Sequence, residues 1–529
     1  MQIKLKSDKI IDKDTTVQEL ITILLKNRQI PKEAVREFIY PSYPEIKLNH
    51  LQKAVTRIQK AIKNKENILI YGDYDVDGLT ATAILWNVLN KLGAKVTPFI
   101  PHRHHDGYGF KSESFFRFQK EKNLKFDLII TVDNGIVADK EFKDISKSAF
   151  GGKCDIIITD HHLPKEKLPK VYTIIHSTKY SGSAISWVLA HALDKDADLG
   201  LAALGTVADC LPLTGINRNI VVHGLKKMNT DPSLGIRQLL AISGNKKEIL
   251  TTYDLGFVLG PRLNAAGRMD NPTDGLRLLC STSKAMADKY ASILDKHNTT
   301  RRDFEKEGIL KAEKLRHPEA SIIVIADNSF LPGIIGLIAG RLTEKYHLPS
   351  IIIAQDKEIS KASCRSISQV NIVEVLRHFS DLLLDLGGHA GAAGFSILTK
   401  NIPIFTKKLE KYLTQKFDKI TEIDAEMSLS AVNMRNINAI SKLEPFGIGN
   451  PKPIFLLKNI KINSFRTVGS TKDHLQLKLA NNLSAIAFKQ GKMEKYLKIG
   501  QSIDILASLD INVWQNTSSP QLIIKEILL

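Results

Sequence analysis

The chain has few cysteines and no apolar run long enough to cross a membrane. Its 529 residues include four cysteines, which lie far apart and form no Cys-x-x-Cys pair. This spacing argues against a cysteine-rich zinc site or a disulfide framework and favours a reducing compartment. The most apolar stretch, 321–340, is interrupted by Asp327, Asn328 and Pro332. The first residues lack the apolar segment of a secretory signal, so we expect a cytoplasmic protein with no membrane partner.

Repeats and low-complexity tracts are also missing, and the composition is that of an ordinary globular protein. Hydrophobic residues make up 43% and charged residues 25% of the chain. A chain of 529 residues is too long for one core and predicts about three domains. The net charge of +18 suits a polyanionic partner, although a lysine-rich solvated surface would give the same balance.

Three aspartates stand at alternate positions directly after an apolar run. Asp73, Asp75 and Asp77 follow Ile68-Leu69-Ile70, which has the pattern of a buried strand. Carboxylates this close repel one another unless a cation lies between them. Oxygen ligands suit Mg²⁺ or Mn²⁺, so the pattern predicts a site for a hard divalent metal.

The same aspartate pattern also opens an EF-hand calcium loop, which needs a bidentate glutamate at its twelfth position. Counting from Asp73, the twelfth residue is Ile84. A strand precedes the motif where an EF-hand has a helix. Both mismatches argue against a calcium loop.

Two further apolar runs end in acids. The run 127–132 leads into Asp133, and the run 155–159 leads into Asp160-His161-His162. Continuous apolar strands alternating with polar segments indicate a parallel sheet buried on both faces. Ligands of such sheets bind beyond the carboxyl ends of the strands, so the acids are expected to converge on one cleft. The imidazoles favour Mn²⁺ over Mg²⁺.

Three of these residues have ordinary structural explanations when each is taken alone. Asp133 could form an Asx turn with the following Asn-Gly. Asp209, before a Leu-Pro-Leu segment, could be a cap. His162 could be a core histidine.

The motifs together resemble a known family. Segments 71–80, 132–135, 160–162 and 207–213 match, in order, the four motifs of the DHH phosphoesterases, which take their name from the Asp160 triplet. Within that family the chain is most similar to the RecJ group of single-strand-specific 5′→3′ DNA exonucleases. Segments 260–269, 386–394 and 443–453 carry the further likeness to this group.

The resemblance implies an α/β fold of three parts. These are a parallel-sheet DHH phosphoesterase domain, a second α/β DHH-associated domain and a C-terminal OB-type β-barrel. Period-two alternation in 474–479 agrees with the barrel. The expected parts are an N-terminal lead-in that packs on the core (1–45), the DHH catalytic domain (46–275), a long connecting helix (276–320), the DHH-associated domain (321–400) and the OB-type nucleic-acid-binding domain (420–529).

The resemblance also assigns the acids and histidines. Asp75, Asp77, His161 and His162 are expected to be catalytic, with His162 contacting the scissile phosphate. Two ions, Mn²⁺ or Mg²⁺, are expected. Their predicted ligands are Asp73, Asp75, Asp77, Asp133, His161 and Asp209.

Nucleic-acid-binding residues are expected around this centre. Arg103 follows the predicted strand 96–100 on the cleft side, where a guanidinium can grip phosphate, although a surface salt bridge would also explain it. The resemblance adds Arg262, Arg268, Ser363, Arg365 and His389.

The chain departs from the group's usual pattern in two places. Ala362 and Cys364 stand in the predicted phosphate-binding loop where small residues, often glycine, are usual. Phe330-Leu331 stand where Trp-His is usual, and the leucine side chain cannot hydrogen-bond.

The sequence therefore predicts a metal-dependent 5′→3′ exonuclease on single-stranded DNA, acting in repair and recombination. Two alternatives stay open: a DHH phosphodiesterase acting on short oligonucleotides or cyclic dinucleotides, and a non-catalytic nucleic-acid-binding scaffold. The expected state is a monomer whose protein partners are a single-strand-binding protein or a helicase.

Overall fold

The computed structural model describes residues 2–103, 105–147, 154–245, 247–515 and 517–529. Two compact units divide the chain. The larger unit holds residues 48–208 and 228–419, and the smaller holds 1–47, 209–227 and 420–529. Among the described helices, none is both long and apolar enough to cross a membrane.

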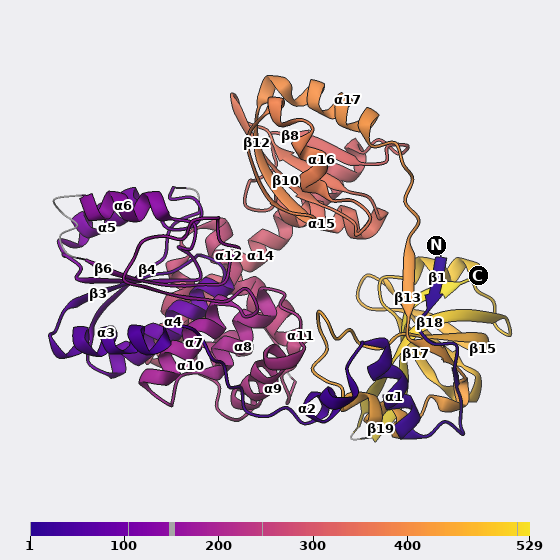
Figure 1. Ribbon diagram of the computed structural model, residues 1–529. Coiled ribbons are helices and arrows are strands. Elements are labelled where there is room, and N and C mark those ends of the chain that lie inside the picture. The colour runs from indigo at the N-terminus through magenta and orange to yellow at the C-terminus, as the bar shows by residue number, and fades with distance from the viewer. Residues whose placement is uncertain (1, 104, 148–153, 246, 516) are drawn as a thin grey trace. The chain divides into compact units, whose positions relative to one another are not determined.

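The first sheet of the larger unit is parallel throughout, as the apolar runs predict. Its strand order is β4 (Lys95–Phe99), β3 (Asn67–Tyr71), β5 (Leu128–Val132), β6 (Asp155–Asp160) and β7 (Thr173–His176). Every residue of β5 is buried, because helices cover both faces. Helices α5 (Ser112–Lys122) and α6 (Asp139–Lys147) lie on one face, and α3 (Leu51–Lys63), α4 (Val76–Lys91) and α7 (Gly182–Leu193) lie on the other (Figure 1).

Helices connect this sheet to the next one. Helix α8 (Leu199–Ala208) packs on α4 and α7. After α10 (Leu234–Ile242), helix α11 (Thr252–Asp254) runs through a π-helical turn (Leu255–Leu259) into α12 (Gly260–Met269), which α13 (Thr273–Leu279) follows. The expected long connecting helix is α14 (Lys284–Leu315), which packs against α12 and α13.

The second sheet of the larger unit is mixed. Its order is β11 (Leu383–His389), β12 (Ala392–Leu398), β10 (Ile359–Arg365), β9 (Ser350–Ala354) and β8 (Ile323–Asp327), and only β8 and β9 are parallel. One face packs against α15 (Ile335–Tyr346). Helices α16 (Ile372–Arg377) and α17 (Ile402–Tyr412) contribute to the core on the other face.

The smaller unit is built around a closed β-barrel, which confirms the OB-type prediction. The barrel strands are β15 (Phe455–Val468), β16 (His474–Leu479), β17 (Ser484–Ala487), β19 (Thr517–Leu528) and β18 (Ser502–Trp514). Strand β15 pairs with both β16 and β18, which closes the ring. Alternate residues of β16 are buried, as its period-two pattern requires.

Residues 1–47 belong to this barrel unit and not, as the sequence suggested, to the catalytic core. Strand β1 (Gln2–Leu5) pairs with β13 (Ile420–Ile423), and β2 (Ile10–Ile11) pairs with β14 (Ala425–Met427). Leu20 and Leu24 of α1 (Val17–Asn27) are buried in the barrel core. The buried Arg218 links three segments, because it donates hydrogen bonds to the carbonyls of Phe38, Glu444 and Pro445.

Candidate metal centre and nucleic-acid-binding residues

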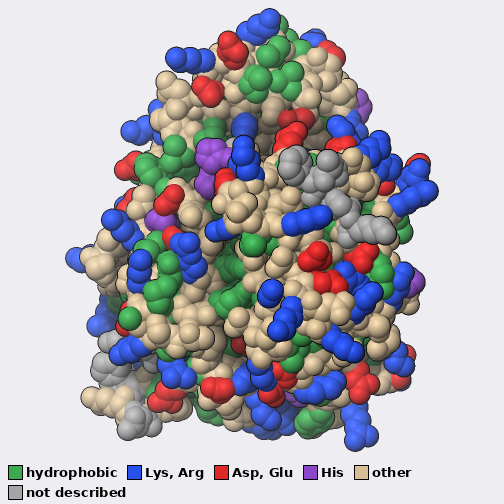
Figure 2. Space-filling view, turned by 90° about the vertical axis from the view of Figure 1, so that its left-hand side faces the viewer, with side chains coloured by type: hydrophobic (Ala, Val, Ile, Leu, Met, Phe, Trp, Pro, Cys, Tyr) green, Lys and Arg blue, Asp and Glu red, His purple; other side chains and the backbone are tan. Residues whose placement is uncertain are grey.

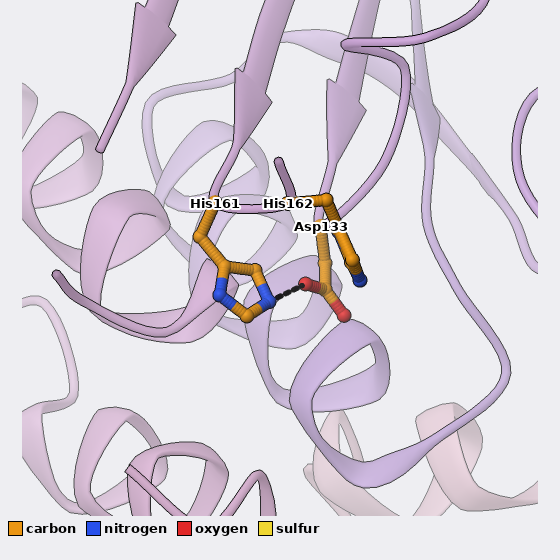
Figure 3. A group of neighbouring side chains, drawn as sticks. All are labelled: Asp133, His161 and His162. Carbon is orange, nitrogen blue, oxygen red and sulfur yellow. Dashed lines mark ion pairs between the residues drawn. The ribbon is translucent and has the colours of Figure 1, made fainter. Parts of the chain in front are cut away.

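The acids and histidines after β3, β5 and β6 lie at the same edge of the parallel sheet. Asp73, Asp75 and Asp133 form one group, and Asp133, His161 and His162 form another. Within each group the potential ligand atoms lie within 4.8 Å of one another. Figure 3 shows the second group, with both imidazoles beside the Asp133 carboxylate. The structure thus brings together residues that are up to 89 positions apart in the chain (162 − 73).

The aspartates of the first motif have fixed positions because the start of α4 holds them. Asp75 is the N-cap of α4, and its Oδ1 accepts a hydrogen bond from the Gly78 amide at 3.0 Å. A β-carbon at position 78 would lie 2.6 Å from the Asp73 carbonyl oxygen, so only glycine lets the chain turn here.

Asp77 is held by a second helix. Its carboxylate accepts hydrogen bonds from the amides of Gly182, at 2.6 Å, and Ser183, at 2.9 Å. Both amides belong to the first turn of α7, where backbone N–H groups are free and the helix dipole favours negative charge. Asp77 therefore reaches the centre as an oriented carboxylate.

Asp133 has the backbone and side-chain geometry expected of a metal ligand. Its φ of 62° is left-handed, which is unusual for a residue other than glycine. Its Oδ1 is buried and accepts no hydrogen bond from the described residues. His161 Nε2 lies 3.1 Å from this oxygen and 3.8 Å from Asp77 Oδ2. A divalent ion between these donors would satisfy them together.

Burial and mutual repulsion raise the pKa values of these carboxyls. Burial, with the neighbouring Asp75 charge, raises the pKa of Asp73 to about 8. Burial also raises the pKa of Asp75, with Asp77 as the next cause, and raises the pKa of Asp133 well above its usual range. Burial lowers the pKa of His161. Such a set fits a cation, because a bound positive charge would keep the carboxyls ionised.

Asp160, to which the sequence analysis assigned no catalytic or metal-binding role, is a positioning residue. Its Oδ1 accepts hydrogen bonds from His162 Nδ1, at 2.8 Å, and from the His161 amide, at 2.7 Å. Its Oδ2 accepts from the Ile136 amide at 2.8 Å. Burial alone would raise the pKa of Asp160, but the His162 ring and the backbone amides of Ile136 and His162 hold this pKa below its usual value. The carboxylate therefore orients the His162 ring and holds the backbone at His161, and its place in the triplet was the available signal.

Tyr108 was also missed. Its hydroxyl lies 2.6 Å from His162 Nε2. In the neutral His162 ring, Nδ1 donates to Asp160, so Nε2 accepts from Tyr108. No spacing in the sequence places Tyr108 beside the triplet, because it lies in the loop between β4 and α5.

Asp209 directly follows the last residue of α8 and begins the segment 209–227 of the smaller unit. Helix α8 packs closely against Asp77 of the candidate metal centre. A β-carbon at Gly205 would collide with Asp77 Oδ1 and Ser183 Oγ. Glycine at this position allows α8 to pack against both.

Four arginines share one region of the larger unit. Burial lowers the pKa of Arg268 to about 10, and the charges of Arg103, Arg301 and Arg365 contribute to the shift. Partly buried guanidinium groups that lie this close repel one another, and an anion between them would offset that repulsion. Arg103 lies over the Tyr74 ring, 5.6 Å from its centroid.

Arg301 on α14 was absent from the predicted set. It pairs with Glu305 at 3.2 Å, and its Nε is buried with no hydrogen-bond partner among the described residues. On the face of the molecule that Figure 2 shows, lysine and arginine side chains are spread widely.

Ser363 and Arg365 lie on strand β10 and not, as predicted, in a loop. Because side chains alternate along a strand, Ala362 and Cys364 are buried in the core on the opposite face. A β-carbon at Gly336 of α15 would lie 2.9 Å from Ser363 Oγ and 3.4 Å from Arg365 Nη2. Ala362 and Cys364 therefore leave the polar face of β10, with Ser363 and Arg365, intact.

Three other predicted or noted residues lie in different settings. Arg262 donates to Asp295 on α14, at 2.8 Å, and to the Val258 carbonyl, so it secures α12 on α14. His389 is exposed at the end of β11, where its Nδ1 accepts from the Gly391 amide at 3.3 Å. Phe330 is buried in the core around α15, while Leu331 is 37% exposed.

Comparison with known proteins agrees with this architecture. Models of the DHH family N-terminal domain, the DHHA1 domain and the RecJ OB domain match residues 67–213, 319–415 and 423–526.

Two curated relatives are both described as single-stranded-DNA-specific exonuclease RecJ. The one from Bacillus subtilis is 33% identical over 96% of this chain and 67% of its own length. The one from Haemophilus influenzae is 31% identical, covering 90% of each chain. The crystal structure of RecJ from Thermus thermophilus with Mn²⁺ superimposes with a TM-score of 0.83 at 29% identity, over 97% of this chain and 76% of that one. The chain belongs to the RecJ exonuclease family, within the DHH family.

Proposed function

We propose that this chain is a metal-dependent 5′→3′ exonuclease that hydrolyses phosphodiester bonds of single-stranded DNA. The observation that carries the proposal is the pairing of two features in one unit. Clustered carboxylates and imidazoles stand at the edge of the parallel sheet, and four partly buried arginines that repel one another lie in the same unit. The substrate comes from the relatives, whose descriptions specify single-stranded DNA.

Each proposed metal ligand lies at the end of a strand or a helix. Two divalent ions, Mn²⁺ or Mg²⁺, would activate a water and stabilise the leaving oxygen of an in-line displacement. The proposed ligands are Asp73, Asp75, Asp77, Asp133, His161 and Asp209.

His162 has a separate role. Its ring is fixed by Asp160 at Nδ1 and presents Nε2, where Tyr108 now donates. We assign this nitrogen to the scissile phosphate, which takes the place of the Tyr108 hydroxyl. Asp160 supports the exchange because its negative charge stabilises a protonated His162.

The arginines hold the DNA phosphates. Arg103, Arg268 and Arg365, with Ser363, supply the donors, and Arg301 adds positive charge beside Arg268. Arg262 supports them by keeping α12 in place, and the exposed His389 is assigned a peripheral contact. An anionic phosphate would restore the charge balance around Arg268.

The remaining assignments rest on the family. They are action from the 5′ end, a role of the barrel in binding the unpaired strand, a function in repair and recombination, a cytoplasmic monomer, and a single-strand-binding protein or helicase as partner.

Digestion of end-labelled DNA tests the proposal. The substrates are 5′-labelled and 3′-labelled single strands, the matching duplex and a dinucleotide, each with Mn²⁺, Mg²⁺ or EDTA. We expect early loss of the 5′ label from single strands only, and none in EDTA. Turnover of the dinucleotide without cleavage of long strands would indicate a small-substrate phosphodiesterase. No turnover of any substrate would indicate a scaffold.

A further inference from the structure

A pair of exposed aromatic rings lies on the helical segment that leads to the arginines. Tyr253 and Phe257 are 59% and 67% exposed, although side chains of this size are usually covered. Their rings stack with centroids 4.9 Å apart and planes inclined by 25°. Neither ring belongs to the hydrophobic cores described above.

The local structure holds this pair in place. Phe257 lies in the π-helical turn Leu255–Leu259, a feature often found at functional sites. Asp254, which is 1% exposed, accepts hydrogen bonds from the Thr251 amide and from Lys247 Nζ at 3.0 Å. The same contact places Lys247 Nζ over the Tyr253 ring, 4.9 Å from its centroid. A fixed aromatic stack beside a cation is the arrangement on which unpaired nucleobases stack.

The pair is connected to the proposed active site by a continuous helical segment. Gly256 and Gly260 lie against Val207 and Ala208, the last residues of α8. The helix then continues through α12 to Arg268. Phe257 and Arg268 are 11 residues apart (268 − 257), which is about 16 Å at a rise of 1.5 Å per residue. That length corresponds to about five nucleotides of a stacked strand.

We infer that Tyr253 and Phe257, with Lys247, form a stacking platform for bases of the unpaired strand about five nucleotides from the phosphate held by the arginines. The inference rests on the proposed function for the identity of the polymer. The inference adds a separate contact that only a strand of sufficient length can reach, so longer oligonucleotides should bind more tightly. An unpaired strand is the favoured occupant because aromatic faces accept any base without reading its sequence.

Binding measured without hydrolysis tests the platform. The full chain is titrated in EDTA with fluorescein-labelled oligo-dT of 4 and 20 nucleotides, and anisotropy is recorded. The double variant Tyr253→Ala/Phe257→Ala should lose about tenfold or more in affinity for the 20-mer, as expected for lost base stacking. Its loss for the 4-mer should be at least fivefold smaller. Tyr412→Ala, an exposed aromatic on α17, is the matched control.

Crosslinking gives a second readout on the wild-type protein. Oligonucleotides carry one bromodeoxyuridine at position 2 or at positions 5 to 7 from the 5′ end, and crosslinked peptides are mapped. Crosslinks from positions 5 to 7 to the 251–259 segment support the platform.

The platform would be overturned if the double variant lost affinity equally for the 4-mer and the 20-mer, or if its affinity for the 20-mer were unchanged. It would also be overturned if the double variant changed the sedimentation of the protein but not its binding to DNA. Failure of the exonuclease proposal would appear separately, as absent hydrolysis of labelled DNA by the wild-type protein with metal.

Discussion

The Oδ1 atom of Asp160 lies 2.8 Å from Nδ1 of His162, and the carboxylate is almost completely buried. This contact fixes the ring whose other nitrogen meets the Tyr108 hydroxyl. The same oxygen also accepts a hydrogen bond from the His161 amide, which holds the backbone of the triplet in place. Partners of this kind commonly tune ligands and reacting groups without touching the substrate.

Asp160→Asn should lower kcat on single-stranded DNA by about 10- to 100-fold, with a smaller change in KM, because the amide removes the charge that supports His162. Steady-state kinetics with Mn²⁺ measure both constants. Asp303→Asn, on the exposed surface of α14, is the control. An unchanged kcat would show that Asp160 has no part in positioning His162.

Arg268→Gln should weaken binding of single-stranded DNA about 10-fold or more while leaving Tm unchanged or higher. The Arg268 side chain repels Arg103, Arg301 and Arg365, so its removal lowers the charge repulsion in the folded state. The same change removes a hydrogen-bond donor to phosphate. Anisotropy titrations in EDTA and thermal unfolding provide the two readouts.

The control for this prediction is Arg277→Gln, whose partner Asp274 lies on the same helix. Its side chain is half exposed and its ion pair contributes little. A large loss of Tm in Arg268→Gln with unchanged affinity would assign Arg268 to packing.

Metal binding should release protons. The pKa of Asp73 is raised to about 8, so at pH 6 the metal-free folded protein holds a proton that an ordinary carboxyl, with a pKa of 3.8, has lost. Mn²⁺ displaces this proton, so affinity should rise between pH 6 and pH 8. Calorimetric titrations in two buffers of different ionisation enthalpy measure the release. A pH-independent affinity without proton release would contradict the assignment.

The same shift predicts the stability of the metal-free protein. A carboxyl with a raised folded-state pKa contributes stability below its unfolded pKa, and this contribution is lost as pH rises through the folded value. In EDTA, Tm should therefore fall between pH 5 and pH 8, and Asp73→Asn should reduce that fall. The opposite slope in wild type and variant alike would indicate that other groups dominate.

Gly205→Ala should destabilise the fold by about 1–3 kcal/mol, the usual cost of overpacking. The new methyl group would collide with Asp77 Oδ1, which the α7 amides hold in place. Mn²⁺ affinity should fall with it. Gly256→Ala, where the added carbon would meet Val207 at an ordinary 3.6 Å, is the control. Denaturant unfolding and Mn²⁺ titration measure the two effects. Equal changes in unfolding free energy and in Mn²⁺ affinity for Gly205→Ala and Gly256→Ala would contradict the account.

The fold class and the strands that position the site could be predicted because apolar runs and acids were adjacent in the chain. Ile68-Leu69-Ile70 and the two later runs form β3, β5 and β6, and parallel pairing brings their ends together. The period-two pattern of 474–479 is β16 of the closed barrel.

Features that depend on distant packing were not predictable. Gln2 pairs with Ile420, so residues 1–47 join the barrel through contacts that no local pattern encodes. Arg301 has the pattern of a surface residue on a long polar helix, and only tertiary packing places its charge near Arg268. The segment 362–365 suggested a loop by family likeness, whereas its alternating burial defines a strand.

The most direct test of the central claim is an anomalous diffraction map from crystals soaked in Mn²⁺. The account predicts manganese peaks at the carboxyl edge of the first sheet, within coordination distance of Asp133 and His161, and their loss in Asp75→Asn/Asp133→Asn. Manganese bound elsewhere, or no peak at this edge at saturating Mn²⁺, would contradict it.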